Sequence, residues 1–195
     1  SPAKGAGSDT AKDIATLIYN VIRNRGCMNI REERPSDIEK IWELHLDAFE
    51  TEAEANLVNT LRSSGCPYVS MVAEIENIVV GHILFTPVEL TGNENKLKIM
   101  GLAPMAVLRQ YQNKGIGSKL VEAGLEYCQS QGYDAVVVLG HPDYYPKFGF
   151  VPSVKYGIKS EYEVPDDVFM ILELVPEALN SHEGVIRYHE AFNSV

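Results

Sequence analysis

A glycine-rich turn between an apolar stretch and a helical pattern constrains the fold of this chain most. The apolar stretch, residues 98–107, reads as a strand, and the turn after it has the sequence QNKGIG at residues 112–117. Apolar residues then recur at helical spacing up to Gln131, and Gly132 is placed as a C-terminal stop. The first amides of a helix lack intrahelical partners, and the helix dipole adds partial positive charge there. The turn is therefore a candidate site for a phosphate-bearing ligand.

Two better-known phosphate-binding turns do not match this segment. The dinucleotide-binding fingerprint needs a third glycine three residues after the second, and Leu120 stands there. The P-loop needs Gly-Lys-Ser/Thr after four spacer residues, which the segment lacks. Because glycines also start and stop helices for steric reasons alone, this turn does not decide the function.

A second segment, about thirty residues further on, adds the evidence on function that the turn alone does not give. A short apolar run at residues 135–139 is followed by GHPDYYPKFGF at residues 140–150. Together, the two segments resemble the GNAT superfamily of acetyl-CoA-dependent N-acetyltransferases. The matching positions are Val107, Gln112, Gly115, Gly117, Tyr145, Gly149 and Phe150. Further matches, to the first and third strands of that family, are Ile30-Arg31, Pro35-Ser36-Asp37, Val80-Gly81 and Ile83, so that the resemblance covers residues 28–174.

The resemblance implies an α/β (α+β) fold. Its central sheet would be mixed and mainly antiparallel, flanked by helices, with a splayed strand pair at the acetyl-CoA site. The residue patterns add helices at 37–49 and 52–63, and strands at 69–75, 79–88, 155–159 and 168–174. Turns are predicted at residues 76–77 and 91–95.

The first of these helices is expected to begin with a capping box formed by Ser36 and Glu39. Its apolar side would contain Ile38, Ile41, Trp42 and Phe49, and would also carry His45. We interpret His45 as a buried, hydrogen-bonded histidine in preference to a catalytic one.

The resemblance also assigns cofactor-binding residues. The backbone of Met105, Ala106 and Val107 would pair with the pantetheine arm like an added strand, and the Val107 amide would face the thioester carbonyl. The diphosphate would be held by Gln112, Asn113, Lys114, Gly115, Ile116, Gly117 and Ser118. No metal is implied.

Tyr145 matches the tyrosine that the family commonly uses as general acid. A phenol has a reference pKa of about 10 against about 8.5 for an alkyl thiol, so it stays protonated and can donate to a departing thiolate. The alternative role for Tyr145 is a core aromatic packed against Phe148 and Phe150, and Tyr144 could be the packing residue instead.

The group that removes the acceptor's proton is not identified by the sequence. Many family members carry a glutamate in the strand before the glycine turn, but residues 98–107 contain no acid. Glu74, His82 and His141 are candidates, each also expected as a structural or solvent-facing residue, and water relays are an alternative. The chain also lacks the asparagine that many relatives carry before the tyrosine, since residues 138–140 read Val-Leu-Gly.

The function implied is transfer of an acetyl group from acetyl-CoA to an amine by direct attack in a ternary complex. No cysteine in either motif suggests an acyl-enzyme. An acyl-CoA-binding sensor without turnover and a purely structural domain are the alternatives. The acceptor, a small molecule or a protein N-terminus or lysine, is left open, as is a homodimer.

Composition excludes other classes of protein. The net charge is −10 over 195 residues, which argues against a nucleic-acid partner. An acidic surface would favour cationic partners such as amines, but solubility alone also explains the charge and is the preferred explanation. Three cysteines without paired spacing indicate reduced thiols in a cytoplasmic protein. No apolar run approaches the length that spans a membrane.

The resemblance divides the chain at residue 28. Residues 28–195 would form the acetyltransferase domain. Residues 1–27 carry an apolar helical stripe from Ile14 to Ile22, and we interpret this segment either as an expression leader or as a docking helix.

Overall fold

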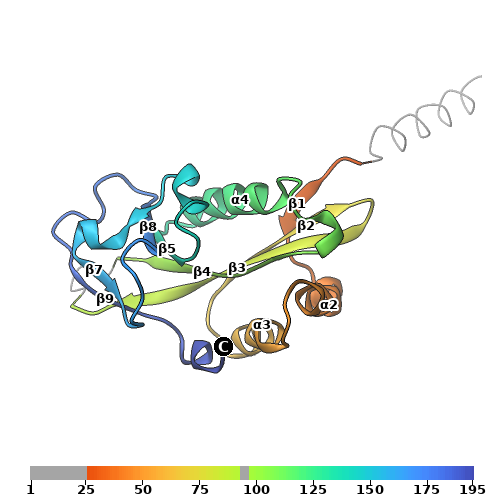
Figure 1. The fold of residues 1–195 in the computed structure, drawn as a ribbon, viewed down its shortest axis with the longest axis horizontal. Helices are drawn as coiled ribbons and strands as arrows, with labels where there is room; N and C mark the ends of the chain where they lie inside the picture. The colour runs from red at the N-terminus through yellow and green to blue at the C-terminus, as the bar shows by residue number, and fades with distance from the viewer. Residues whose placement is uncertain (1–25, 93–96) are drawn as a thin grey trace, which may run out of the picture.

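The computed structural model describes residues 26–92 and 97–195. One central sheet has α4 on one face and α2 and α3 on the other (Figure 1). The helices and strands are β1 (Asn29–Glu32), α2 (Ile38–Ala48), α3 (Ala53–Ser63), β2 (Val69–Ile75), β3 (Ile78–Leu90), β4 (Ile99–Val107), α4 (Ile116–Ser130), β5 (Ala135–Leu139), β6 (Val151–Pro152), β7 (Ile158–Ser160), β8 (Phe169–Glu173) and β9 (Gly184–Arg187). Short 3₁₀ helices are η1 (Pro35–Asp37), η2 (Arg109–Tyr111), η3 (Tyr145–Phe148), η4 (Ser153–Tyr156) and η5 (Glu190–Ser194).

The strand order of the main sheet is β1-β2-β3-β4-β5-β8-β6, and its neighbours are antiparallel except β4 and β5. β9 pairs with the far end of β3 and with β7. The predicted mixed, mainly antiparallel sheet between helices is therefore confirmed. β4 precedes the glycine turn and β5 follows α4. These two strands form the parallel pair, because α4 crosses over from the end of one to the start of the other.

The parallel pairing of β4 with β5 covers only the first part of β4. It begins at Ile99 opposite Ala135 and ends at Leu102 opposite Val138. Just beyond that point β4 carries a bulge relative to β3 and contains Pro104, which has no N–H to donate. The part of β4 from residue 103 to residue 107 has β3 on one side and an open edge on the other, which is the splay that the family resemblance implies.

Two clusters of buried side chains hold the layers together. On the α4 side, Leu120, Val121 and Cys128 pack against the sheet, as their helical spacing predicts. On the opposite side, Ile41, Leu44 and neighbouring α3 side chains pack against inward-facing residues of β2, β3 and β4.

The predicted buried side of α2 is partly wrong. Ile41 and His45 are buried as expected, but Leu44 is buried in place of Ile38, which is 37% exposed. The cause is Asp37, whose carboxylate turns inward to bind Arg31 at 2.6 Å and the Arg34 amide at 2.8 Å. Successive side chains of a helix point about 100° apart, so Ile38, which follows Asp37, faces outward.

Other boundaries differ from the prediction at their ends. No hydrogen bond of a capping box joins Ser36 and Glu39; Asp37 precedes a helix that starts at Ile38. The predicted strand at 155–159 is wrong for its first half, because Ser153–Tyr156 forms η4 and Gly157, at φ +70°, turns the chain into β7. The predicted hairpin at residues 76–77 is confirmed, with positive φ at both positions.

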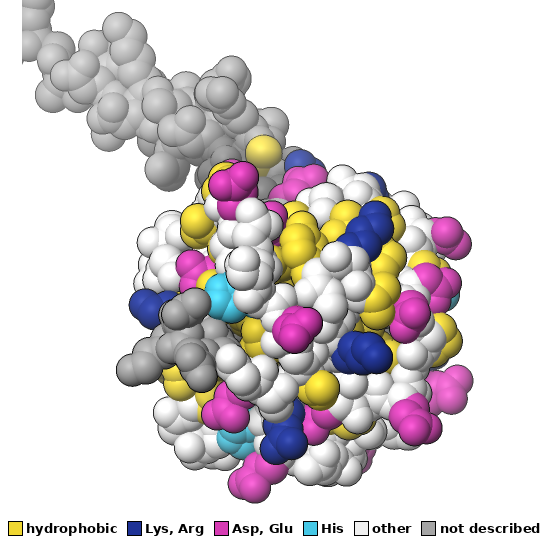
Figure 2. Space-filling view, turned by 90° about the vertical axis from the view of Figure 1, so that its left-hand side faces the viewer, with side chains coloured by type: hydrophobic (Ala, Val, Ile, Leu, Met, Phe, Trp, Pro, Cys, Tyr) yellow, Lys and Arg dark blue, Asp and Glu magenta, His cyan; other side chains and the backbone are white. Residues whose placement is uncertain are grey.

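Some predictions fall outside the described residues, namely the apolar stripe from Ile14 to Ile22 and most of the turn at 91–95. In the described part of the chain, no helix has the length and apolar character to cross a membrane. Figure 2 shows one face of the molecule, where acidic and basic side chains are interspersed over the described residues and hydrophobic ones gather in the upper right.

Candidate active site

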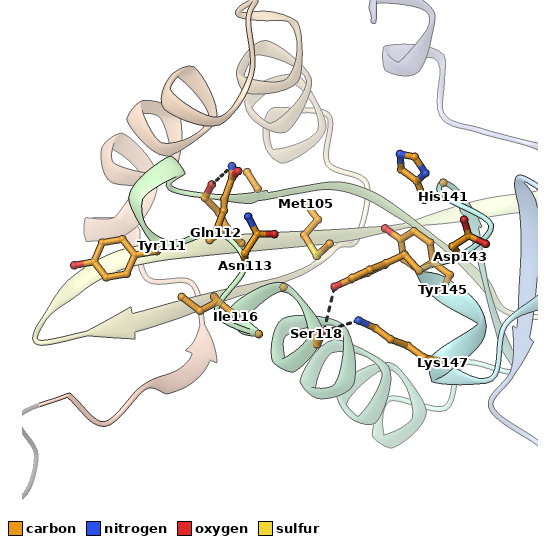
Figure 3. A pocket seen from close by; sticks show the side chains of 16 residues that line it. Met105, Tyr111, Gln112, Asn113, Ile116, Ser118, His141, Asp143, Tyr145 and Lys147 are labelled. Atoms are coloured by element: carbon orange, nitrogen blue, oxygen red, sulfur yellow. Dashed lines mark hydrogen bonds between the residues drawn. The ribbon is translucent and has the colours of Figure 1, made fainter.

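A cavity of about 870 Å³ lies between β4, the N-terminus of α4 and the segment that follows β5. It brings together Tyr145 and nearly all of the predicted cofactor-binding residues (Figure 3). Those that line it are Met105, Ala106, Val107, Gln112, Asn113, Gly115, Ile116, Gly117 and Ser118. Lys114 does not line it, because its Nζ donates to the carbonyl of Gln110 at 2.9 Å.

The open edge of β4 directs two backbone amides toward this cavity. In an antiparallel pair, residues that exchange backbone hydrogen bonds alternate with residues that exchange none. The Leu108 N–H donates to the Val80 carbonyl at 2.9 Å, so Leu108 is a residue that exchanges hydrogen bonds with β3. By the alternation, Val107 and Met105 exchange no backbone hydrogen bonds with β3. Their N–H and C=O groups therefore point away from β3, and the Val107 carbonyl already accepts from Gln112 Nε2 at 3.0 Å.

The turn before α4 has the shape of an anion cradle. Gly115 has φ +80°, a left-handed conformation that other residues adopt with strain, and its carbonyl accepts from the Lys119 amide. A Cβ at Gly117 would lie 3.1 Å from the Tyr144 hydroxyl, so glycine keeps the first turn of α4 open. The free amides of that turn can hold a phosphate group.

Lys147 is a cavity-lining cation that the sequence analysis missed. Its Nζ donates to Ser118 Oγ at 2.9 Å and lies 3.8 Å from the centre of the Tyr144 ring. The Tyr144 hydroxyl lies 3.4 Å from the same Ser118 oxygen. This contact places a positive charge beside the N-terminus of α4, where an anion would bind.

Tyr145 is both a packed aromatic and a cavity residue. Its ring contacts Tyr144, Phe148 and Phe150, and burial raises its pKa to about 12, with a smaller contribution from Tyr144. A Cβ at Gly140 would lie 2.3 Å from the Tyr145 ring, so that glycine permits the ring position. Figure 3 shows the hydroxyl directed across the cavity toward β4.

Comparison with known proteins decides the family. Residues 29–152 match the family model described as the acetyltransferase (GNAT) domain. The chain belongs to the GNAT family. The resemblance noted in the sequence is thereby confirmed.

Relatives of this GNAT chain are similar over most of its length. The uncharacterised N-acetyltransferase YhbS of Escherichia coli strain K12 is 37% identical over 167 residues, covering 85% of this chain and 99% of YhbS. The YhbS crystal structure in complex with CoA superposes with a TM-score of 0.82 at 36% identity, covering 86% of this chain and 93% of that one. A GNAT acetyltransferase of Brucella melitensis in complex with acetyl-CoA has a TM-score of 0.71 at 34% identity, covering 86% and 99%.

The three candidate bases of this GNAT chain lie in different surroundings. Glu74 is bound to Arg31 at 2.6 Å and does not line the cavity. His82 is fully buried on the α2 and α3 face of the sheet, where it is hydrogen-bonded to His45 and Ser70. His141 lines the cavity, and Figure 3 shows its ring turned toward the side on which α2 and α3 lie.

The sequence had no signal for two further lining residues of the GNAT cavity, Tyr111 and Asp143. Tyr111 ends η2 just before the glycine turn, and Asp143 lies in the turn between β5 and η3. Only the fold shows that both residues reach the cavity. In the described residues, no group of three or more His, Cys, Asp and Glu side chains is arranged to hold a metal ion.

Proposed function

We propose that the protein is an acetyl-CoA-dependent N-acetyltransferase that moves an acetyl group to an amine by direct attack in a ternary complex. The observation that carries this proposal is that one cavity combines the open edge of β4, the N-terminus of α4 and the hydroxyl of Tyr145. Structures of relatives in complex with CoA and acetyl-CoA support the same ligand here.

The chain provides separate groups for the separate parts of acetyl-CoA. The turn at residues 112–118 would hold the diphosphate through main-chain amides, with the Lys147 ammonium beside it. The outward-facing backbone groups of Met105 and Val107 would pair with the amides of the pantetheine arm. The reactive end would then lie near Tyr145, where β4 and β5 separate.

Two hydrogen-bond donors would stabilise the charges that develop during transfer. The Val107 N–H would donate to the thioester oxygen as it gains negative charge. Tyr145 would donate to the departing sulfur. Its pKa of about 12 lies above the value of about 8.5 for an alkyl thiol, which favours a hydrogen bond to the thiolate over early proton transfer.

Direct attack fits the surroundings of the cysteines. All three lie among the described residues, and none lines the cavity. Cys128 is fully buried on the sheet-facing side of α4, and burial raises the pKa of its thiol to about 12, so a thiolate nucleophile is disfavoured. The acceptor would be an amine on a small molecule or at a protein N-terminus or lysine.

Binding of acetyl-CoA is tested first, by the shift in melting temperature that a ligand specific to the folded state produces. Gly115→Ala and Gly117→Ala should each reduce the shift strongly. Gly65→Ala is the matched control for Gly115, because Gly65 also has positive φ, at +76°, and open space around it, but lies outside the cavity. Both glycine variants responding like the parent would place the diphosphate elsewhere.

Turnover is tested next, by release of the CoA thiol with a library of amines. Acetylation of at least one amine class is expected. Binding of acetyl-CoA without turnover of any amine would favour the alternative function, an acyl-CoA-binding sensor.

Replacing Tyr145 with phenylalanine tests its proposed role in the reaction. The change keeps the ring and its packing, and removes a hydrogen bond to a charged group that contributes about 1.5–3 kcal/mol. We expect turnover to fall by at least about tenfold, with an unchanged acetyl-CoA shift. Tyr144→Phe, the neighbouring control, should be milder. Near-parental turnover of Tyr145→Phe, with chemistry rate-limiting, would leave the ring with a packing role only.

A further inference from the structure

The mechanism above leaves one step without a residue, the loss of a proton from the acceptor nitrogen. An alkylammonium has no lone pair for attack until a proton leaves, and a positioned side chain commonly takes it. Of the three candidate bases, Glu74 does not line the cavity, and His82 is buried outside it. His141 is the candidate that lines the cavity.

Imidazole is the side chain that suits this step best among those present. The titratable residues that share the cavity with His141 are Tyr111, Asp143, Tyr144, Tyr145 and Lys147. Phenols and an ammonium carry their protons at pH 7, so the two possible proton acceptors are the imidazole and the Asp143 carboxylate. A carboxylate is the weaker base, whereas imidazole changes charge between pH 5 and 8.

The backbone of one turn fixes the position of His141 relative to Tyr145. The His141 carbonyl accepts from the amides of Tyr144 at 3.1 Å and Tyr145 at 3.5 Å. On its other side, the Gly140 N–H donates to the Val168 carbonyl at 2.9 Å, which ties the turn to the residue before β8. The proposed donor to the sulfur and the candidate base therefore leave the same anchored turn, four residues apart.

The two side chains point in different directions from this turn. Figure 3 shows the Tyr145 hydroxyl directed across the cavity toward β4, and the His141 ring turned toward the side on which α2 and α3 lie. Under the proposed function, acetyl-CoA occupies the other side, where the turn before α4 holds its diphosphate. An acceptor that reaches the thioester from the free side would have the imidazole beside it.

His141 also has a direct outlet for the proton. The residue is exposed, in contrast to the buried histidines His45 and His82. A proton taken up by its ring can therefore pass to the solvent, and no second acceptor inside the protein is needed.

We propose that His141 is the general base of the transfer. The proposal rests on the proposed function. The imidazole takes one proton from the ammonium and releases it to the solvent, and the nitrogen lone pair attacks the thioester carbon. Once the C–S bond has broken, the Tyr145 hydroxyl gives its proton to the sulfur, and the second proton lost by the nitrogen restores the hydroxyl. The ammonium and the thioester have become an amide and a thiol, and one proton has left the site, with no change of oxidation state.

His141→Asn removes the base at an exposed position, where the folded state should tolerate the change. The substrate is the library amine with the fastest turnover that is protonated at pH 7. Turnover should fall by about 10² or more, because a positioned base contributes about 10²–10⁴ in rate. Acetyl-CoA should shift the melting temperature as in the parent.

The pH dependence and chemical rescue separate a base from a residue that only binds the acceptor. The loss in His141→Asn should shrink as the pH rises toward the pKa of the acceptor ammonium, since the amine then arrives without its extra proton. His141→Ala should lose turnover too, and should regain part of it as imidazole in solution fills the open position. A loss that is equal at all pH values and is not rescued by imidazole would overturn the proposal.

Two variants serve as controls. His182→Asn removes a histidine that lies outside the cavity and should leave turnover unchanged. Asp143→Asn changes the other possible proton acceptor of the cavity and should lose much less turnover than His141→Asn. A pH-recoverable loss in Asp143→Asn that His141→Asn lacks would assign the role to the carboxylate and overturn the proposal.

Turnover of the parent distinguishes failure of this inference from failure of the proposed function. Parental rates in His141→Asn, with chemistry rate-limiting, would overturn the base and leave the transferase activity established. A parent that binds acetyl-CoA and acetylates no amine would overturn both.

Discussion

Lowering the pH from 7.5 to 5 should destabilise the protein through two buried histidines, His45 of α2 and His82 of β3. Burial lowers the pKa of His45 from about 6.5 to about 4, and that of fully buried His82 in the same direction. A group with a depressed pKa in the folded state stays neutral there, while the unfolded chain takes up a proton. The stabilisation is thus complete above about pH 6.5 and is lost as the pH falls toward 4.

The size of this effect follows from the His45 value. The difference between about 6.5 and about 4 corresponds to about 3 kcal/mol when fully expressed. At pH 5 an unfolded histidine is mostly protonated and His45 is mostly neutral, so about 2 kcal/mol should already be lost. His82 adds to this loss.

Urea unfolding at pH 7.5 and pH 5 measures the difference. The parent should lose about 2 kcal/mol or more of its free energy of unfolding between these values, and His45→Gln should lose less, because one depressed histidine is gone. Equal free energies of unfolding for the parent at both pH values would refute the argument, and with it the neutral state of the two rings.

Three further predictions concern the cavity and the N-terminal segment. Gly140→Ala should displace the Tyr145 ring and lower turnover as Tyr145→Phe does, while keeping the acetyl-CoA shift; parental turnover would contradict the close contact. Lys147→Met should weaken acetyl-CoA binding about tenfold or more but leave acetylpantetheine unaffected, as isothermal titration would show, because only the former carries the phosphates. Deletion of residues 1–27 should leave the acetyl-CoA shift and the oligomeric state unchanged, and loss of a dimer would instead identify the segment as a docking helix.

Local patterns in the sequence predicted the elements that build the cavity. The strand, turn and helix around Gly115 follow from spacing over some twenty residues, and β5 and Tyr145 follow from an apolar run and the motif after it. Such features depend on neighbours in the chain, and a sequence displays neighbours directly. The roles given to these residues remain predictions that the experiments above address.

Contacts between distant segments could not be read in the same way. Lys147 meets Ser118 only because η3 folds back against α4, and His45 meets His82 across 37 positions. The outward turn of Ile38 depends on an ion pair that Asp37 makes with β1. In each case the decisive partner lies in another element, and hydrophobic periodicity holds no information about it.

The open stretch of β4 amounts to a sheet edge in the middle of a sheet. Edges usually invite pairing with another chain, but this one lies in a cavity that is also lined by the N-terminus of α4 and the segment after β5. The outward amides of Met105 and Val107 should therefore exchange their hydrogens with solvent readily in the free protein and slowly once an arm is paired to them. Hydrogen exchange at these two positions would report occupancy residue by residue, for any thioester offered and without a known acceptor.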